Sequence, residues 1–178
     1  MMNNNSDNKK RAGYTVYVAT WINWQNKMGA YGCSIFSEAD GSLFYRDYAY
    51  DALDSPSHGE IKALVKALSH IPVEEPVLLK TSQPAVMAGI NYSLISWIKQ
   101  NWQTKKGHSV KSQEEWQKIH DLIQGRKILA LQTQEDEFNF LQNTCREFIA
   151  FYEECGLSNQ LCKVATIGTI DLLDPIPE

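Results

Sequence analysis

The hydrophobic pattern of the first fifty residues is typical of β-strands. Residues 14–22 read YTVYVATWI, a run rich in β-branched and aromatic side chains. Two further apolar runs, 33–37 and 43–50, are separated by a turn signal around Asp40 and Gly41. Because each run follows closely on the last, we predict three strands in an antiparallel meander.

The pattern changes to a helical period after residue 55. Ser55 and Pro56 mark a helix start, and apolar residues then recur at helical spacing until Pro72. The wholly apolar run 77–79 predicts a central strand covered on both faces, and residues 128–131 predict a last short strand. Further helices are predicted from Pro84 and over 92–102, 111–123 and 137–154. The order β-β-β-α-β-α-α-α-β-α predicts an α/β fold: a mixed five-stranded sheet, three antiparallel strands plus two parallel strands, with helices packed on it.

Composition limits the class of protein. The 178 residues allow one domain, which we place at 14–154, between a polar tail (1–13) and a C-terminal extension (155–178). No apolar run approaches the length of a membrane helix and no targeting segment opens the chain, so we expect a cytoplasmic protein without membrane contact. A net charge of −4 provides no global positive field, so nucleic-acid binding would need a local patch. The four cysteines lack paired spacing and are expected to be buried or half-buried thiols.

Five short motifs follow one another between residues 14 and 151. They are GAYG at 29–32, Glu60 before the run IKAL, TSQ at 81–83, tryptophans flanking a lysine-rich loop over 95–116, and NTCREFIA at 143–150. In this order and spacing they resemble the ribonuclease H family, specifically the bacterial type with a basic protrusion. The resemblance covers nearly the whole presumed domain and implies a ribonuclease-H-like fold.

The resemblance also implies a chemistry, from which this chain departs. Family members cleave the RNA strand of an RNA–DNA hybrid with four carboxylates that hold two Mg²⁺ ions, which need several anionic oxygens. Glu60 matches one carboxylate, and Glu147 stands where the family has Asp. Ala19 (or Thr20, depending on one gap) and Thr81 replace the other two aspartates, and the family's histidine before the last helix is missing.

Glu60 and Glu147 are therefore expected to be catalytic remnants and at most weak metal ligands. No cofactor is expected, except Mg²⁺ or Mn²⁺ if the protein is active. The alternative is that Glu60 is a first-turn acid favoured by the helix dipole and that Glu147 is a solvated helical acid.

A lysine-rich loop provides a candidate nucleic-acid surface, because lysine neutralises phosphate and aromatic rings stack on bases. The candidates are Lys99, Trp102, Lys105, Lys106, His108 and Lys111. The alternative is that the tryptophans pack the protrusion onto the domain while the lysines are merely solvated.

Three functions stay open on this sequence. The favoured hypothesis is a non-catalytic module that binds nucleic acid (an RNA–DNA hybrid or duplex) or a protein partner. The second is an active metal-dependent ribonuclease H whose site is rebuilt from Glu60, Glu147 and the acidic run Glu135–Glu137. The third is a protein-interaction domain without nucleic-acid affinity. The acidic, apolar end of the chain, residues 170–178, is a candidate protein-binding segment; the favoured alternative is a disordered end without a role.

Overall fold

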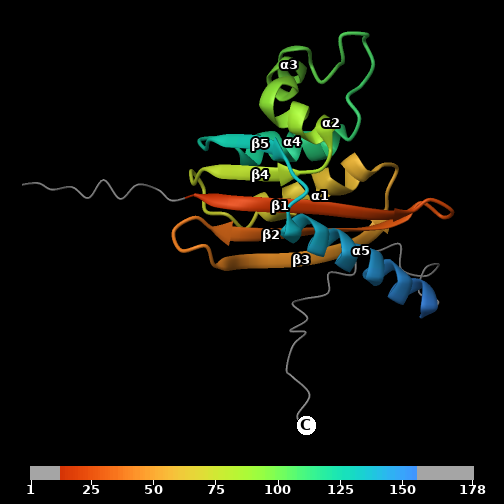
Figure 1. Cartoon of the computed structure of the whole chain (residues 1–178). Helices are drawn as coiled ribbons and strands as arrows, with labels where there is room; N and C mark the ends of the chain where they lie inside the picture. The colour runs from red at the N-terminus through yellow and green to blue at the C-terminus, as the bar shows by residue number, and fades with distance from the viewer. Residues whose placement is uncertain (1–12, 156–178) are drawn as a thin grey trace, which may run out of the picture.

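A computed structural model of the chain describes residues 13–155 and contains the predicted five-stranded sheet (Figure 1). Strands β1 (Tyr14–Asn23), β2 (Met28–Ser37) and β3 (Leu43–Ala52) form an antiparallel meander. Strands β4 (Val77–Thr81) and β5 (Ile128–Gln132) add in parallel, which gives the order β3-β2-β1-β4-β5. The predicted α/β architecture is confirmed. β2 begins five residues earlier than predicted, because residues 28–32 pair with 19–23 across a tight hairpin.

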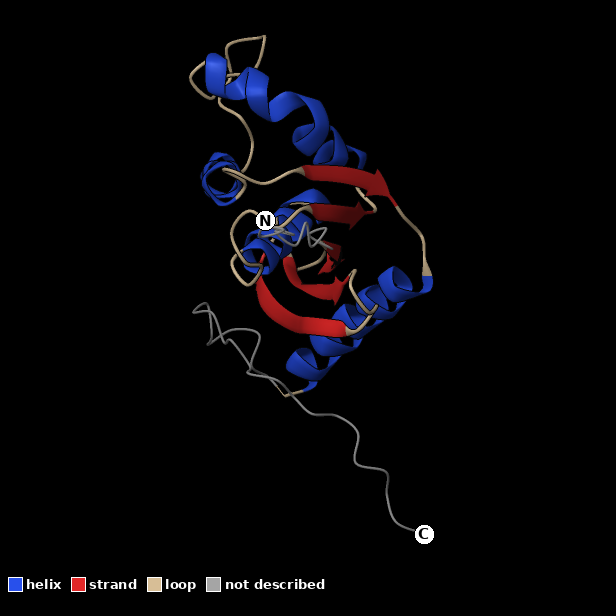
Figure 2. Ribbon diagram, turned by 90° about the vertical axis from the view of Figure 1, so that its left-hand side faces the viewer, coloured by secondary structure: helices blue, strands red, loops and turns tan. Residues whose placement is uncertain are grey.

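Helices cover both faces of the sheet (Figure 2). Helix α1 (Pro56–Leu68) packs on one face, and α5 (Asp136–Glu154) crosses the other. The remaining helices are α2 (Pro84–Ala88), the π-helical turn η1 (Gly89–Ser93), α3 (Leu94–Lys99) and α4 (Gln113–Leu122). None of the helices within residues 13–155 is long and apolar enough to span a membrane.

The start of α1 follows from its local sequence. The Ser55 hydroxyl accepts a hydrogen bond from the backbone N–H of His58 (3.2 Å), and Pro56 occupies the first turn, where its missing N–H costs nothing. Beyond this cap, Leu64 lies at 0% exposure in the main core, together with Val16 and Leu79 from the sheet. Burying each such side chain stabilises the fold by about 1.5–3 kcal/mol. The cap and the core together fix where the first turn of α1 meets the sheet.

Strands β1 and β4 diverge near the middle of the sheet. Their pairing covers only Tyr14–Tyr17 and Val77–Lys80, after which β4 ends at Thr81 while β1 continues to Asn23. Ligands of open α/β sheets bind at the carboxyl ends of strands where neighbouring strands part. The residues at this divergence are therefore the first place to look for a functional site.

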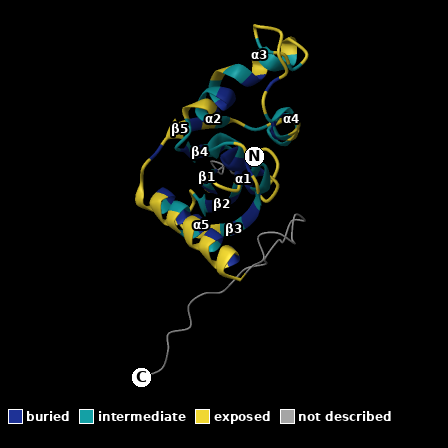
Figure 3. Ribbon diagram, turned by 90° about the vertical axis from the view of Figure 1, so that its right-hand side faces the viewer, coloured by how far each residue is buried: buried dark blue, intermediate teal, exposed yellow. Residues whose placement is uncertain are grey.

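The tails proposed from the sequence lie outside the described residues, apart from Gly13 and Cys155 at their borders. Cys33 and Cys145 are buried free thiols, as predicted, whereas Cys155 is exposed at the end of α5. Figure 3 shows that the segment around α3 projects from the β5 side of the sheet and is largely exposed.

Candidate functional site

The carboxylate of Glu60 lies at the divergence of β1 and β4, where α1 meets the end of β4. Only 1% of Glu60 is exposed. The Thr81 hydroxyl donates to one carboxylate oxygen, and the Ser82 hydroxyl donates to the other at 2.6 Å. Gln83 supports both hydroxyl groups. Its backbone N–H donates to the Thr81 hydroxyl oxygen (3.1 Å), and its side-chain amide donates to the Ser82 hydroxyl oxygen (2.9 Å). Glu60 is thus held by a closed network of neutral groups.

Burial dominates the electrostatics of this carboxyl group. It raises the pKa of Glu60 to about 7, although the hydrogen bonds from Ser82 and Thr81 partly offset the effect. Burial is also the main cause of the raised pKa of the Cys145 thiol, and electrostatic interaction with Cys33 and Glu60 raises this pKa further. Near neutral pH, a substantial fraction of Glu60 is therefore protonated.

The side chains that α5 turns toward β1 are apolar or neutral. Ala19 is completely buried against Phe138 and Leu141, and the Cys145 thiol lies 3.9 Å from the carbonyl oxygen of Ala19. Glu147 follows Cys145 by two residues, about 200° around the helix, and it is exposed. Figure 3 shows exposed residues along this outer side of α5. The structure does not bring Glu147 to Glu60.

Thr20, the other residue proposed for the position of the family's first aspartate, packs against α1. A Cβ atom added to Gly59 would lie 2.3 Å from the Thr20 hydroxyl oxygen and 2.6 Å from its methyl carbon. The close approach of β1 to α1 therefore requires glycine at position 59. The Thr20 hydroxyl is buried and has no hydrogen-bond partner among the described residues. Neither Ala19 nor Thr20 supplies an anion here.

The acidic run before α5 is engaged elsewhere. The carboxylate of Glu135 accepts from the Lys80 ammonium (2.6 Å) and the Tyr17 hydroxyl (2.5 Å), and these bonds lower the pKa of Glu135. Glu137 accepts from Arg46 (2.6 Å) and Ser34 (2.6 Å). These side chains tie the start of α5 to the sheet and do not complete a carboxylate cluster around Glu60.

The family's pair of Mg²⁺ ions does not fit these residues. Two such ions need several anionic oxygens around them. At the divergence of the strands, Glu60 instead meets two hydroxyl groups, and the buried Ala19 side chain of β1 packs against apolar residues of α5. Across residues 13–155, no group of three or more His, Cys, Asp or Glu side chains could hold a metal ion.

The basic protrusion, residues 94–112, separates into a packed base and an exposed rim. Trp97 meets Trp116 edge-on with ring centroids 5.3 Å apart, and Trp116 is buried. Trp102 is half-buried near His120, at 6.4 Å. The basic candidates are all exposed; they are Lys99, Lys105, Lys106, His108 and Lys111. The Lys111 ammonium lies 3.6 Å from the carboxylate of Asp54. The tryptophans pack the protrusion, and the basic groups face solvent.

One exposed feature was missed in the sequence analysis. Trp24, in the turn between β1 and β2, is 62% exposed, and nearby Trp21 is 40% exposed. The available signal was Trp24 within the polar stretch 23–28, which lies between the first two predicted strands.

Comparisons with known proteins agree with this architecture. A family model of ribonuclease H matches residues 11–132, more than half of the chain. Ribonuclease H of Xanthomonas oryzae pv. oryzae is 28% identical over 78 residues, 44% of this chain and 52% of that protein. That of Clostridium botulinum is 26% identical over 141 residues, 77% of this chain and 91% of that protein. The chain thus spans about half the length of the first of these curated relatives.

Similarity among solved structures concerns the fold. The foamy viral protease-reverse transcriptase, solved in complex with an RNA/DNA hybrid, superposes with a TM-score of 0.62 at 16% identity, covering 77% of this chain and 20% of that chain. The match of the family model and the shared fold lead to one conclusion: this chain belongs to the ribonuclease H family.

Proposed function

We propose that this protein binds an RNA–DNA hybrid or a related duplex without cleaving it by the two-metal route. The observation that carries the proposal is the environment of Glu60, a buried carboxyl group hydrogen-bonded by Thr81 and Ser82 at the point where the family holds its metals. Membership of the family and a solved structure of the same fold with an RNA/DNA hybrid support the choice of ligand.

The chemistry of the site argues against hydrolysis. Metal-assisted phosphodiester cleavage depends on anions that hold two cations on one phosphate. A carboxyl group with a pKa of about 7 carries only part of its charge at neutral pH, and Ala19 carries none. The Cys145 thiol, whose pKa is raised by burial, stays protonated and is a poor ligand for a hard cation. These groups favour a retained scaffold over a working nuclease.

Binding would depend on the exposed rim of the protrusion. Lys99, Lys105 and Lys106 face solvent there, so they can reach a phosphate backbone without first giving up a buried contact. Each phosphate neutralised releases a counterion, so affinity should fall steeply as the salt concentration rises. Since the net charge of the chain is −4, the attraction has to come from this local surface.

The test combines binding and cleavage in one sample. A labelled RNA–DNA hybrid is titrated with the protein over a series of salt concentrations, with Mg²⁺ or Mn²⁺ present, and the products are separated on a gel. The double variant Lys105→Ala, Lys106→Ala should reduce the slope of log affinity against log salt by up to about 2. Lys127→Ala, which removes an exposed lysine next to β5, should leave the slope unchanged.

Each outcome bears on the proposal. Salt-dependent binding without cleavage supports it. Cleavage that disappears in Glu60→Gln overturns the non-catalytic part and favours a rebuilt site that uses Glu147 or the run Glu135–Glu137. Absence of binding overturns the choice of ligand and favours a protein-interaction domain, for which residues 170–178, outside the described part of the chain, are the candidate segment.

A further inference from the structure

Two indole rings and two cations are exposed around the turn between β1 and β2, where the end of β1 meets α5. Trp24 is 62% exposed and Trp21 is 40% exposed. Trp21 pairs in register with Ala30, so its side chain lies on the α5 face of the sheet, where the guanidinium of Arg146 sits 5.8 Å from the ring centroid. Lys27, in the same turn, is also exposed. We call Trp21, Trp24, Lys27 and Arg146 the hairpin platform.

The hairpin platform is held in place by its neighbours. Within the turn, the Asn23 side chain accepts from the Gln25 N–H (2.9 Å), and that of Asn26 accepts from the Met28 N–H (3.0 Å). Both asparagine amides donate to the carboxylate of Glu153 on α5. The turn is thus tied to α5 as well as closed upon itself. A surface fixed in this way loses little conformational entropy when it binds a ligand.

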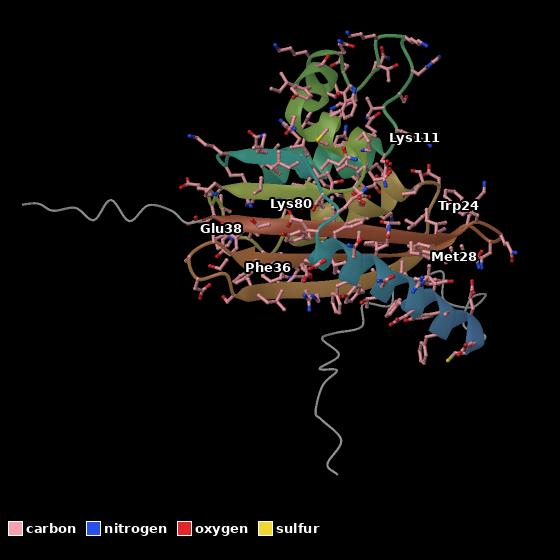
Figure 4. The ribbon with its side chains drawn as sticks, viewed as in Figure 1. Trp24, Met28, Phe36, Glu38, Lys80 and Lys111 are labelled. Atoms are coloured by element: carbon pink, nitrogen blue, oxygen red, sulfur yellow. The ribbon has the colours of Figure 1, made fainter. Side chains whose placement is uncertain are left out.

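The hairpin platform adjoins the surface proposed for nucleic acid. The Lys27 carbonyl accepts from the backbone N–H of Leu53 (2.9 Å), and the carboxylate of the next residue, Asp54, lies 3.6 Å from the Lys111 ammonium at the base of the protrusion. Figure 4 shows Trp24 and Lys111 at the same edge of the molecule, beside the end of β1. A strand that extends beyond a duplex bound at the protrusion can therefore reach the turn that carries Trp24 and Lys27.

The chemistry of the hairpin platform suits an unpaired nucleotide better than a protein surface. Every nucleobase has a π-face that stacks on an aromatic ring, and cations beside the ring neutralise the adjoining phosphates. The residues that flank Trp24 in the turn are polar, so its ring does not belong to the continuous apolar patch typical of a protein-binding face; they are Asn23, Gln25, Asn26 and Lys27. The nearby acid, Glu153, is already engaged by the two asparagine amides.

We propose that Trp24 and Trp21 stack an unpaired nucleobase at the end of a bound duplex, while Lys27 and Arg146 neutralise its phosphates. The inference rests on the proposed function and narrows its ligand to a hybrid with a single-stranded extension. Base stacking is sequence-tolerant, so no preference for a particular base follows.

The experiment compares blunt hybrids with hybrids that carry a short single-stranded extension, of RNA in one arm and of DNA in the other. Binding is followed by anisotropy of a labelled hybrid and by quenching of tryptophan fluorescence. The full chain should prefer the extended hybrid by about tenfold, which corresponds to about 1.4 kcal/mol. Trp24→Ala should abolish the preference while leaving affinity for the blunt hybrid unchanged. The control Tyr92→Ala removes an aromatic ring that is 74% exposed on η1 and should change neither affinity.

Failure of this inference differs from failure of the proposed function. If neither hybrid binds, the proposed function is wrong and the inference falls with it. If both hybrids bind equally well, or if Trp24→Ala weakens both to the same extent, only the inference is overturned. Should Trp24→Ala fail to fold, Trp24→Phe keeps a smaller stacking ring and should retain part of the preference; loss of folding in both variants would show a structural role and overturn the inference.

Discussion

The carboxyl group of Glu60 can be made permanently neutral by the substitution Glu60→Gln. Glutamine keeps the size of the side chain and one carbonyl oxygen, which can still accept from Ser82 or Thr81. The substitution therefore removes the charge without opening a cavity. It tests whether folding has to bury that charge.

The expected effect follows from the pKa of Glu60, which burial raises from 4.5 to about 7. Between these values the folded protein binds more protons than the unfolded chain, so the free energy of unfolding falls as the pH rises. The slope approaches about 1.4 kcal/mol per pH unit, and over an interval of about 2.5 pH units the loss amounts to about 3 kcal/mol. The stabilisation is complete below pH 4.5 and gone above about pH 7. The free energy of unfolding of the glutamine variant does not fall with pH for this reason.

Urea denaturation, followed by tryptophan fluorescence at a series of pH values from about 5 to 8, measures the effect. The free energy of unfolding of Glu60→Gln relative to the unsubstituted protein should rise by about 2.5 kcal/mol between pH 5 and pH 8, since other titrating groups cancel in the difference. Glu147→Gln, which neutralises an exposed carboxylate on α5, should show no such trend. A difference that does not depend on pH would refute the reasoning, because Glu60 would then be ionised in the folded protein and available to a cation.

Three further predictions concern the packing of α1 against its neighbours. Gly59→Ala would place a Cβ 2.3 Å from the Thr20 hydroxyl oxygen and should lower the free energy of unfolding by about 1–3 kcal/mol in urea titrations. Adding Thr20→Ala to the same chain should recover most of the lost stability, and no recovery would contradict the contact between residues 59 and 20. Leu64→Ala, in the fully buried core, should cost about 2–5 kcal/mol and lower the Tm in calorimetry, whereas an unchanged Tm would contradict its burial. Thr81→Asp sets a second carboxylate against Glu60 and should destabilise the fold by about 3–5 kcal/mol at neutral pH. In a thermal-shift assay, Mn²⁺ should restore part of the lost stability, whereas full stability without Mn²⁺ would argue against the buried contact between residues 60 and 81.

Several features could be predicted from the sequence because they depend on local patterns. Alternating and continuous apolar runs identify the five strands, and the Ser55–Pro56 signal identifies the start of α1. Short connections between the first three strands favour their meander, and longer connections that contain helices favour parallel addition of the others. These signals involve residues within about one turn or one hairpin of each other, so a single chain is enough to read them.

The candidate site was only partly accessible to the same reasoning. Residues 60 and 81 could be paired from the motifs, but the position of Glu147 relative to Glu60 depends on how α5 is rotated about its axis. Packing of Phe138, Leu141 and Cys145 against the sheet sets that rotation and leaves Glu147 in solvent. The spacing of a motif along the chain does not show how the helix is rotated about its axis, and a shift of two residues moves a side chain to the opposite face of a helix.

The sequence alone determined the fold class and the order of the strands along the chain. Its motifs also predict that Ala19 (or Thr20) and Thr81 stand in place of two family aspartates. Only the tertiary structure decided that Glu60 is buried among hydroxyl groups, that Trp24 is exposed and that the Arg146 guanidinium lies over the Trp21 ring. The physical reason is that burial and charge depend on contacts between residues far apart in the chain. Hydrophobic periodicity shows which face of a strand or helix turns inward, but it does not show which partners that face will meet.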